Sequence, residues 1–358
     1  MRSHIKTVLL FLVVALLIAW FVGSLDARQL AEARARVAAA DKLSIIVGVL
    51  LICTTYFLRA LRWRVLLRRV APAGLNDLFA ATTVGFASVF LVGRAGELLR
   101  PAFLTARDPR VPAATSFMTI AVERVCDMAA IALLFAAALP FVSASDAAAD
   151  SRLVLVRQAG IVVLAGAGLG VICLLLARQF TPRITAYLDA RAERGGGFAA
   201  RVARTLANLL RQFADALGVF GDAHSLAATI GWTAVLWGTV VVINMIVLRA
   251  FGLGVGVAET IFVLGCSLVG SLVPAPGGAA GTYHAATAGG LALLGADQEQ
   301  ALAAAFVLHL VVWSPALPFG AYYFVRSGAR LGCLREIANR RAEEDAASAD
   351  RQSVRATS

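Results

Sequence analysis

Three regularly spaced charged residues close an apolar stretch of the sequence, 82–93. Arg94, Glu97 and Arg100 are each three residues apart, so on a helix they would share one face and could pair. Charged groups are costly to bury without partners, and in an apolar chain they mark a functional site by default. We therefore expect these side chains to lie against partners or in a wet cavity.

A second charged group consists of Glu123, Arg124 and Asp127. Glu123 and Asp127 are four residues apart, so they project from the same side of a helix. The planar fork of arginine suits a phosphate or a carboxylate, whereas carboxylates suit an ammonium group or a proton. A cavity with both kinds could accept a zwitterionic or anionic lipid headgroup by exchanging internal pairs for pairs with the ligand. The alternative is a buried ion network that only fixes helix packing.

A Gly- and Pro-rich segment, 274–281, suggests a different chemistry. It reads PAPGGAAG and cannot hold a continuous helix, so its backbone groups need partners at the tip of a turn. A helix restarting near Thr282 would present an N-terminus, which attracts anions. Tyr283 is then interpreted as a hydrogen-bonding residue, and His284 either as a ligand or proton carrier or as a satisfied buried histidine. The candidate binding residues are Arg94, Glu97, Arg100, Glu123, Arg124, Asp127, Asn244, Tyr283 and His284, and the candidate tip residues are Gly93, Gly96, Pro274, Pro276, Gly277, Gly278 and Gly281.

The composition identifies the surroundings of these residues. The chain is 59% hydrophobic and 15% charged, with a mean hydropathy of +0.79. Soluble domains carry about 25% charged residues, so we expect a polytopic integral membrane protein. The five cysteines occur singly and are interpreted as small core residues. We expect no metal site and no cofactor.

A helix needs about 20 apolar residues to cross the hydrocarbon core. Two runs, 78–93 and 260–273, are shorter and end in helix breakers, so each could begin a hairpin that enters and leaves on the same side. The predicted fold class is therefore all-α, with six full transmembrane helices and two re-entrant or broken hairpins, which hydropathy alone would count as seven to nine helices. The six predicted spans are 7–23, 43–61, 115–141, 153–177, 227–250 and 301–325.

The distribution of arginines supports this topology. With both hairpins re-entrant, most of the 33 basic residues fall on one side of the membrane, as the positive-inside tendency requires. The prediction places both termini in the cytoplasm, in a bacterial-type plasma (inner) membrane. We expect residues 1–326 to form one domain, which includes an interfacial amphipathic helix at 198–220, and 327–358 to form a basic, disordered tail.

The two predicted hairpins resemble each other weakly. The stretch 85–96 shares Gly, Ser, Leu-Val and a closing Gly with 265–277. Paired broken elements in corresponding halves point to the midplane site of a secondary transporter. The match is short and Gly-rich, so chance similarity is the alternative.

Three motifs together carry a family resemblance. The order Gly93-Arg94-x-Gly96-Glu97-x-x-Arg100, then Glu123-Arg124-x-x-Asp127, then Pro274-x-Pro276-Gly277-Gly278 resembles the flippase-like transmembrane family, named for the membrane half of lysylphosphatidylglycerol synthase. The resemblance covers roughly 42–326. The soluble aminoacyl-transfer domain of the synthase is missing, so lysyl transfer is not carried over. Two departures are Val92-Gly93, where a proline is common, and His284, where an acidic residue is common.

The resemblance implies an integral membrane domain that moves or handles polar lipids between leaflets. Its expected partners are a phospholipid or another polar lipid and a lipid-modifying enzyme, and we expect no nucleic acid. An integral membrane transferase acting on a lipid-linked substrate is one alternative, although catalytic and nucleotide-binding motifs are missing. An accessory or scaffold protein with structural buried charges is the other.

Overall fold

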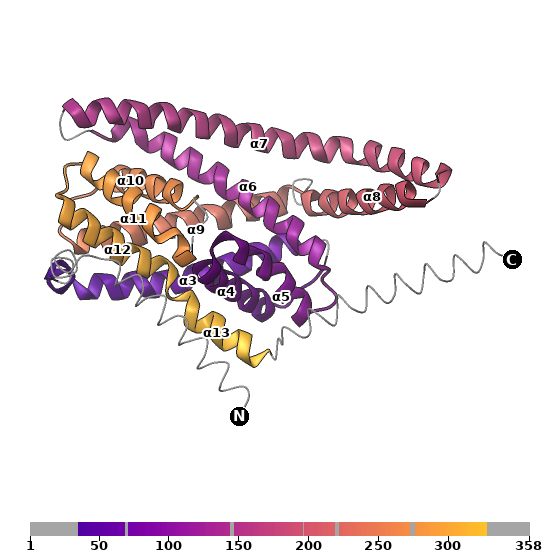
Figure 1. The fold of residues 1–358 in the computed structure, drawn as a ribbon, viewed down its shortest axis with the longest axis horizontal. Helices are drawn as coiled ribbons and strands as arrows, with labels where there is room; N and C mark the ends of the chain where they lie inside the picture. Colours follow the sequence, from indigo (N-terminus) through magenta and orange to yellow (C-terminus); the bar gives the residue numbers. More distant parts are fainter. Residues whose placement is uncertain are drawn as a thin grey trace.

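The computed structural model describes residues 35–68, 71–143, 147–195, 197–218, 222–272 and 276–327 as a bundle of helices (Figure 1). Within these ranges there is no strand, which confirms the expected all-α class. The predicted first span, 7–23, and the predicted tail beyond Ser327 lie outside the described residues. The predicted site residues lie in two halves of the bundle, which are separated in the sequence by a long helical pair and contact each other in space.

The first half contains two long helices and a broken hairpin between them. Its elements are α3 (Lys42–Leu67), α4 (Leu75–Val92), the 3-10 helix η1 (Gly93–Leu98), α5 (Leu99–Arg107) and α6 (Ala113–Ala138). Gly93 has φ 75°, a left-handed conformation that glycine adopts without steric cost, and there the helix α4 ends. Beyond it, α5 packs back against α4.

The second half repeats this order of elements. It contains α9 (Ala223–Ala250), α10 (Val257–Gly270), α11 (Pro276–Leu293), α12 (Gln298–Trp313) and α13 (Ala316–Arg326). Here α10 and α11 pack together as the hairpin, and Gly277 near its tip has φ 70°. The helix α11 begins at Pro276, earlier than the restart predicted near Thr282, because proline is accepted in the first turn of a helix.

The two halves run in opposite directions. The backbone N–H of Asp41, before α3, donates to the carbonyl of Ala250 at the end of α9 over 3.0 Å. Further along the pair, Arg62 on α3 lies 3.2 Å from the hydroxyl of Thr233, near the start of α9. The long helices are therefore antiparallel, and the hairpins also meet, because α4 and η1 contact α11. Antiparallel halves with the same order of elements are typical of inverted repeats in transporters.

A long helical pair joins the halves. After a 3-10 turn, η2 (Leu139–Phe141), the chain forms α7 (Ala147–Arg194) and α8 (Gly197–Leu217). α8, which corresponds to the amphipathic helix predicted at 198–220, packs beside α7 and α6, and the far ends of α7 and α8 extend beyond the other helices (Figure 1). The predicted span at 153–177 lies within α7, but the helix is longer than predicted and continues through Pro182 to Arg194. Leu, Ala and Arg, all strong helix formers, continue it.

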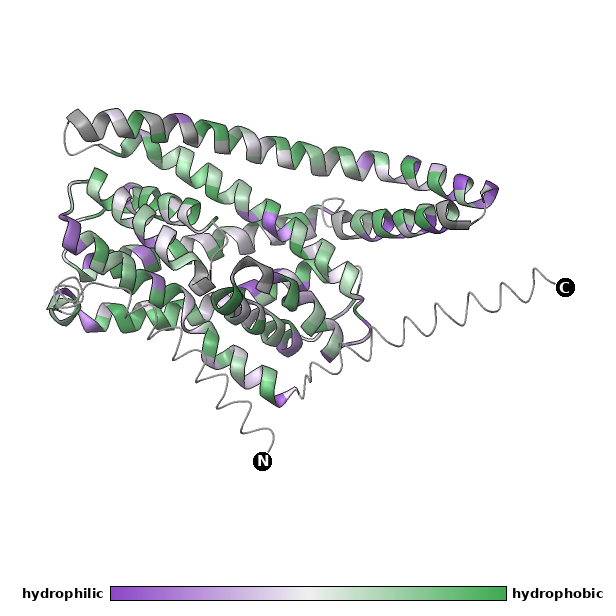
Figure 2. Cartoon of the chain, viewed as in Figure 1, coloured by the Kyte–Doolittle hydropathy of each residue, from purple (hydrophilic) through white to green (hydrophobic). Residues whose placement is uncertain are grey.

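Four helical segments within the described residues are long and apolar enough to cross a membrane. They are α3, α4, α9, and α12 together with α13. Three of them match predicted spans; the predicted seven to nine helices include 7–23, which lies outside the described residues. The prediction that 78–93 is too short is wrong, because α4 begins at Leu75 and has 18 residues. Figure 2 shows that hydrophobic residues cover most of each helix; α6, however, carries three charged residues at 123–127.

Candidate functional site

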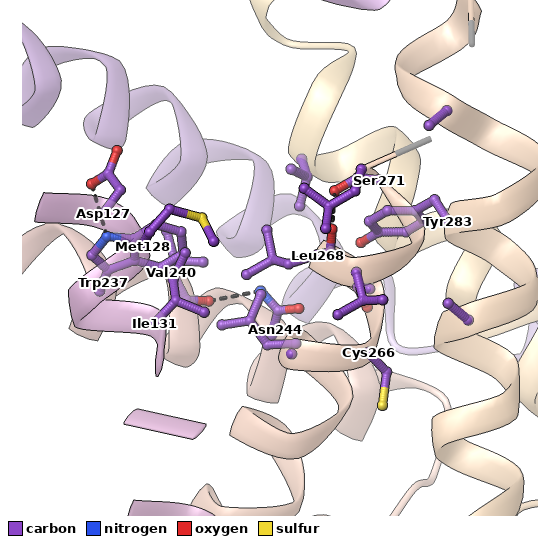
Figure 3. A pocket seen from close by; sticks show the side chains of 18 of the residues that line it. Asp127, Met128, Ile131, Trp237, Val240, Asn244, Cys266, Leu268, Ser271 and Tyr283 are labelled. Atoms are coloured by element: carbon purple, nitrogen blue, oxygen red, sulfur yellow. Dashed lines mark hydrogen bonds between the residues drawn. The ribbon is translucent and has the colours of Figure 1, made fainter. Parts of the chain in front are cut away.

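Asp127 on α6 is held by donors from two other helices. Its two carboxylate oxygens accept hydrogen bonds from the two terminal nitrogens of Arg62, over 2.6 and 3.1 Å. Oδ1 also accepts a bond from the indole N–H of Trp237 on α9, over 3.0 Å (Figure 3). A bidentate arginine–carboxylate pair is among the stronger polar contacts in proteins, so Asp127 ties α3, α6 and α9 together.

Glu123, one helical turn earlier, is paired with three arginines. Arg100 donates to both of its oxygens, over 2.9 and 3.2 Å. Arg124 donates to Oε1 over 2.7 Å, and a nitrogen of Arg62 lies 3.2 Å from the same oxygen. The charged residues of α5 and α6 are thus joined across helices.

This group of charges is buried inside the bundle. The side chains of Arg62 and Glu123 are 0% exposed, and Arg100 and Asp127 are also buried. Burying an ion costs several kcal/mol, which only good geometry and further hydrogen bonds offset. The guanidinium of Arg100 also lies over the ring of Trp63, 4.1 Å from its centroid, which favours the cation there.

A large cavity borders the group of charges. Its volume is about 580 Å³, within the usual size range of small-molecule sites. Its polar wall includes Arg59, Glu97, Arg100, Arg124 and Asp127. Figure 3 shows Asp127 on one side of the view and Ser271 and Tyr283 on the other, with Met128, Leu268 and Asn244 between them. The cavity therefore combines one charged wall with a largely apolar interior.

The predicted second-half residues lie apart from the charges. Asn244 is buried and lines the cavity, and its amide N–H donates to the Val240 carbonyl over 2.8 Å. Tyr283 is another lining residue, whereas His284 is not among them. A ring nitrogen of His284 instead lies 3.2 Å from Nδ1 of His309 on α12. The polar and charged side chains predicted as one set are thus divided between a charged wall and a neutral one.

The remaining predicted residues belong to the tips of the two hairpins. Arg94 lies in η1, and its side chain falls outside the described residues. Gly93 lines the cavity, and Gly96 lies directly against the backbone of Ser88 in α4. Pro274 also falls outside the described residues, while Pro276, Gly277, Gly278 and Gly281 lie within α11. Among the described residues, no group of three or more His, Cys, Asp or Glu side chains could hold a metal ion.

Sequence reasoning missed two arginines of the group, Arg59 and Arg62. The predicted span 43–61 ends before Arg62, and the positive-inside argument counts both arginines on the cytoplasmic side, but α3 continues to Leu67 and buries both. The signals that could have extended the helix were their spacing of three residues and the apolar residues Trp63 and 65–67 on either side of Arg64. The carboxylates of α6 therefore find their main partner on α3.

Comparison with known families and proteins gives one match. The model of the family described as "Lysylphosphatidylglycerol synthase TM region" matches residues 7–320. No curated protein and no solved structure matches the chain. The match covers most of the sequence and includes the charged group, the cavity and both hairpins. The chain belongs to the family of the lysylphosphatidylglycerol synthase transmembrane region.

Proposed function

We propose that this protein moves a polar or charged lipid headgroup between the leaflets of a membrane through its charged cavity, while the lipid tails stay in the bilayer. The observation that carries the proposal is the cavity of about 580 Å³ that has Arg59, Glu97, Arg100, Arg124 and Asp127 in its wall. Ionisable groups inside a membrane protein cost free energy and mark substrate pathways. A headgroup with a phosphate or an ammonium group would find both arginines and carboxylates there.

Family and composition agree with a lipid substrate. The chain is an integral membrane protein of a family related to phospholipid modification or handling. Apolar residues dominate the interior of the cavity, where Ile131, Leu268 and Met128 lie. An apolar interior beside a charged wall suits a molecule with a polar headgroup and apolar tails.

The inverted halves support movement across the membrane. Transporters with antiparallel repeats bind substrate near the bilayer midplane, between discontinuous helices, and alternate access by rocking one repeat against the other. Here the two hairpins contact each other, and Gly93, Glu97 and Tyr283 from them line the cavity. Although α4 is long enough to cross a membrane, α5 packs back against α4, as α11 does against α10. On this ground we propose that both hairpins are re-entrant, with both termini cytoplasmic in a bacterial-type inner membrane.

One observation favours a second function, that of an accessory or scaffold protein. The carboxylate oxygens of Glu123 and Asp127 are fully engaged by arginines and Trp237, as in a network that fixes helix packing. Arg124, whose side chain is 36% exposed, nevertheless faces the cavity, which a packing role does not require.

Leaflet-resolved transport distinguishes the two functions. Purified protein in vesicles is given fluorescent lipids with a panel of headgroups, and the accessible fraction of each lipid is followed by dithionite quenching. For at least one charged or zwitterionic headgroup, we expect the labelled lipid of the inner leaflet to become accessible to dithionite faster than in protein-free vesicles. Rates equal to those of protein-free vesicles for every headgroup would reject transport by the chain alone.

A further inference from the structure

We infer that Arg59 forms a phosphate-binding subsite in the wall of the cavity, which receives a phosphate group carried by the ligand. Arg59 lies on α3, one helical turn before Arg62. Its side chain is only 10% exposed, and it lines the cavity. The inference rests on the proposed function and specifies the chemistry that the headgroup must supply.

Arg59 has hydrogen-bond donors that the described residues do not satisfy. Its Nε and Nη1 atoms are buried without a hydrogen-bond partner there. The closest carboxylate oxygen, Oδ2 of Asp127, is 3.9 Å from Nη1, which is too far for a hydrogen bond. The guanidinium lies 4.8 Å from the ring centroid of Phe86, and this contact satisfies no N–H donor.

The two carboxylates cannot supply the missing acceptor, because other donors occupy them. A carboxylate offers about four acceptor positions. Glu123 uses its positions for Arg62, Arg100 and Arg124. Asp127 uses its positions for Arg62, Trp237 and Arg124. Arg59 is therefore a buried cation whose full set of hydrogen bonds requires an acceptor from outside the group.

The charge balance of the buried group and the cavity wall beside it also favours an anion. Among the described side chains, the group contains the arginines Arg59, Arg62, Arg100 and Arg124 against the carboxylates Glu97, Glu123 and Asp127. One positive charge remains in excess even when Glu97 is counted. A phosphate group has the charge and the several acceptor oxygens that a guanidinium fork binds.

Apolar walls beside Arg59 define where this phosphate sits. Tyr56, Phe86 and Val89 line the cavity with it, so water is partly excluded and the ion pair with a phosphate is strengthened. The phosphate can belong to a phospholipid headgroup or to a free phosphate ion.

Thermal unfolding of the full chain in a neutral detergent tests the subsite with three probes. They are dihexanoyl phosphatidylglycerol, dihexanoylglycerol as its phosphate-free analogue, and inorganic phosphate. We expect the phosphatidylglycerol to raise the melting temperature of the wild type, and the phosphate-free analogue to have little effect. Stabilisation by inorganic phosphate as well would assign binding to phosphate alone. Equal stabilisation by both dihexanoyl probes would overturn the inference.

The substitution Arg59→Met separates binding from folding. It removes an uncompensated buried charge, so without ligand we expect its melting temperature to be equal to or above that of the wild type. Its affinity for dihexanoyl phosphatidylglycerol should fall about tenfold or more, since a hydrogen bond to a charged group contributes about 1.5–3 kcal/mol. Arg211→Gln, in the exposed pair of Arg211 with Asp189, is the matched control and should bind normally.

A second variant and the vesicle assay cover the remaining outcomes. Arg59→Lys keeps the charge and loses the planar fork, so its affinity for dihexanoyl phosphatidylglycerol should lie between those of the wild type and Arg59→Met. It replaces Arg59→Met as the test if that variant does not fold. Wild-type affinity in either folded variant would overturn the phosphate subsite. If that happens while the vesicle assay still shows lipid movement, only the subsite is rejected and the proposed function stands. Loss of lipid movement with intact phosphate binding rejects the function alone.

Discussion

The two halves of the molecule have the same architecture, but the polar link of the hairpin is charged in the first half and neutral in the second. In the first half, Arg100 after the left-handed Gly93 pairs with Glu123 on the next long helix. In the second half, His284 stands at the same separation from the left-handed Gly277, and it pairs with His309 on α12. The hairpin is thus fastened to its neighbouring helix by an ion pair in one half and by two imidazoles in the other.

The difference suggests that the shared architecture needs a polar link and that the charge serves something else. The pair His284 and His309 links a hairpin to a long helix within the membrane without the ions of α6. The cost of burying Arg59, Arg62 and Arg100 in the first half is therefore not explained by architecture alone. We attribute the charge of that half to binding a ligand.

The largest expected effect is from Arg62→Met in the first half. Arg62 is fully buried and contacts both Asp127 and Glu123, so its removal leaves buried carboxylates undercompensated at a cost of about 3–5 kcal/mol. That approaches the whole stability of a domain. We expect a severe loss of monodisperse protein in size-exclusion chromatography, and a yield like that of the wild type would contradict the account of the ion group.

The two hairpins should respond alike to a methyl group at their points of closest approach. A Cβ on Gly96 would lie 2.3 Å from the carbonyl carbon of Ser88, and one on Gly270 would lie 2.4 Å from the carbonyl oxygen of Thr282. Both Gly→Ala substitutions should destabilise the protein by about 1–3 kcal/mol in thermal unfolding. Gly281→Ala is the control, because no atom lies within 4 Å of its Cβ position. If Gly96→Ala destabilised the protein and Gly270→Ala had no effect on its stability, the two hairpins would not be structurally equivalent.

The links between hairpin and helix should differ in strength. His309→Phe keeps an aromatic ring and removes the hydrogen bond with His284, which should cost about 0.5–1.5 kcal/mol. Arg100→Met removes an ion pair with two hydrogen bonds to Glu123 and should cost more. Melting temperatures of the two variants measure this order, and the reverse order would mean that the imidazoles fasten the bundle more strongly than the ion pair.

The smallest effect concerns a feature that both halves share, an aspartate cap. Asp41 accepts hydrogen bonds from the Ser44 hydroxyl and the Leu43 N–H, and these lower the pKa of its carboxyl; Asp222 accepts from Ser225 in the same way before α9. A lowered folded pKa gives stability that is present above the unfolded pKa and is lost as the pH falls through the folded pKa. When the pH is lowered from about 7 to about 3, the melting temperature of Asp41→Asn should fall slightly less than that of the wild type. Identical losses would contradict a role for this carboxylate.

Much of the fold follows from the sequence, whereas the site follows only in part. Apolar runs predict α3, α9 and α12–α13, and the spacing of Glu123 and Asp127 predicts that they act together. Their partner Arg62 was missed because basic residues near the end of an apolar run were assigned to a loop, and only packing shows that α3 continues. The antiparallel contact of α3 with α9 joins residues far apart in the sequence, such as Asp41 and Ala250, and no local pattern predicts it.

The most direct test of the central claim is leaflet-resolved lipid movement in vesicles by Glu97→Gln. Glu97 lines the cavity, and the substitution keeps its shape while it removes one charge. Glu299→Gln makes the same change at an exposed position beside Arg36 and serves as the control. We expect Glu97→Gln to keep the wild-type melting temperature and lose lipid movement, while Glu299→Gln retains both. Normal lipid movement by a stable Glu97→Gln protein would contradict the claim that the charged cavity carries the headgroup.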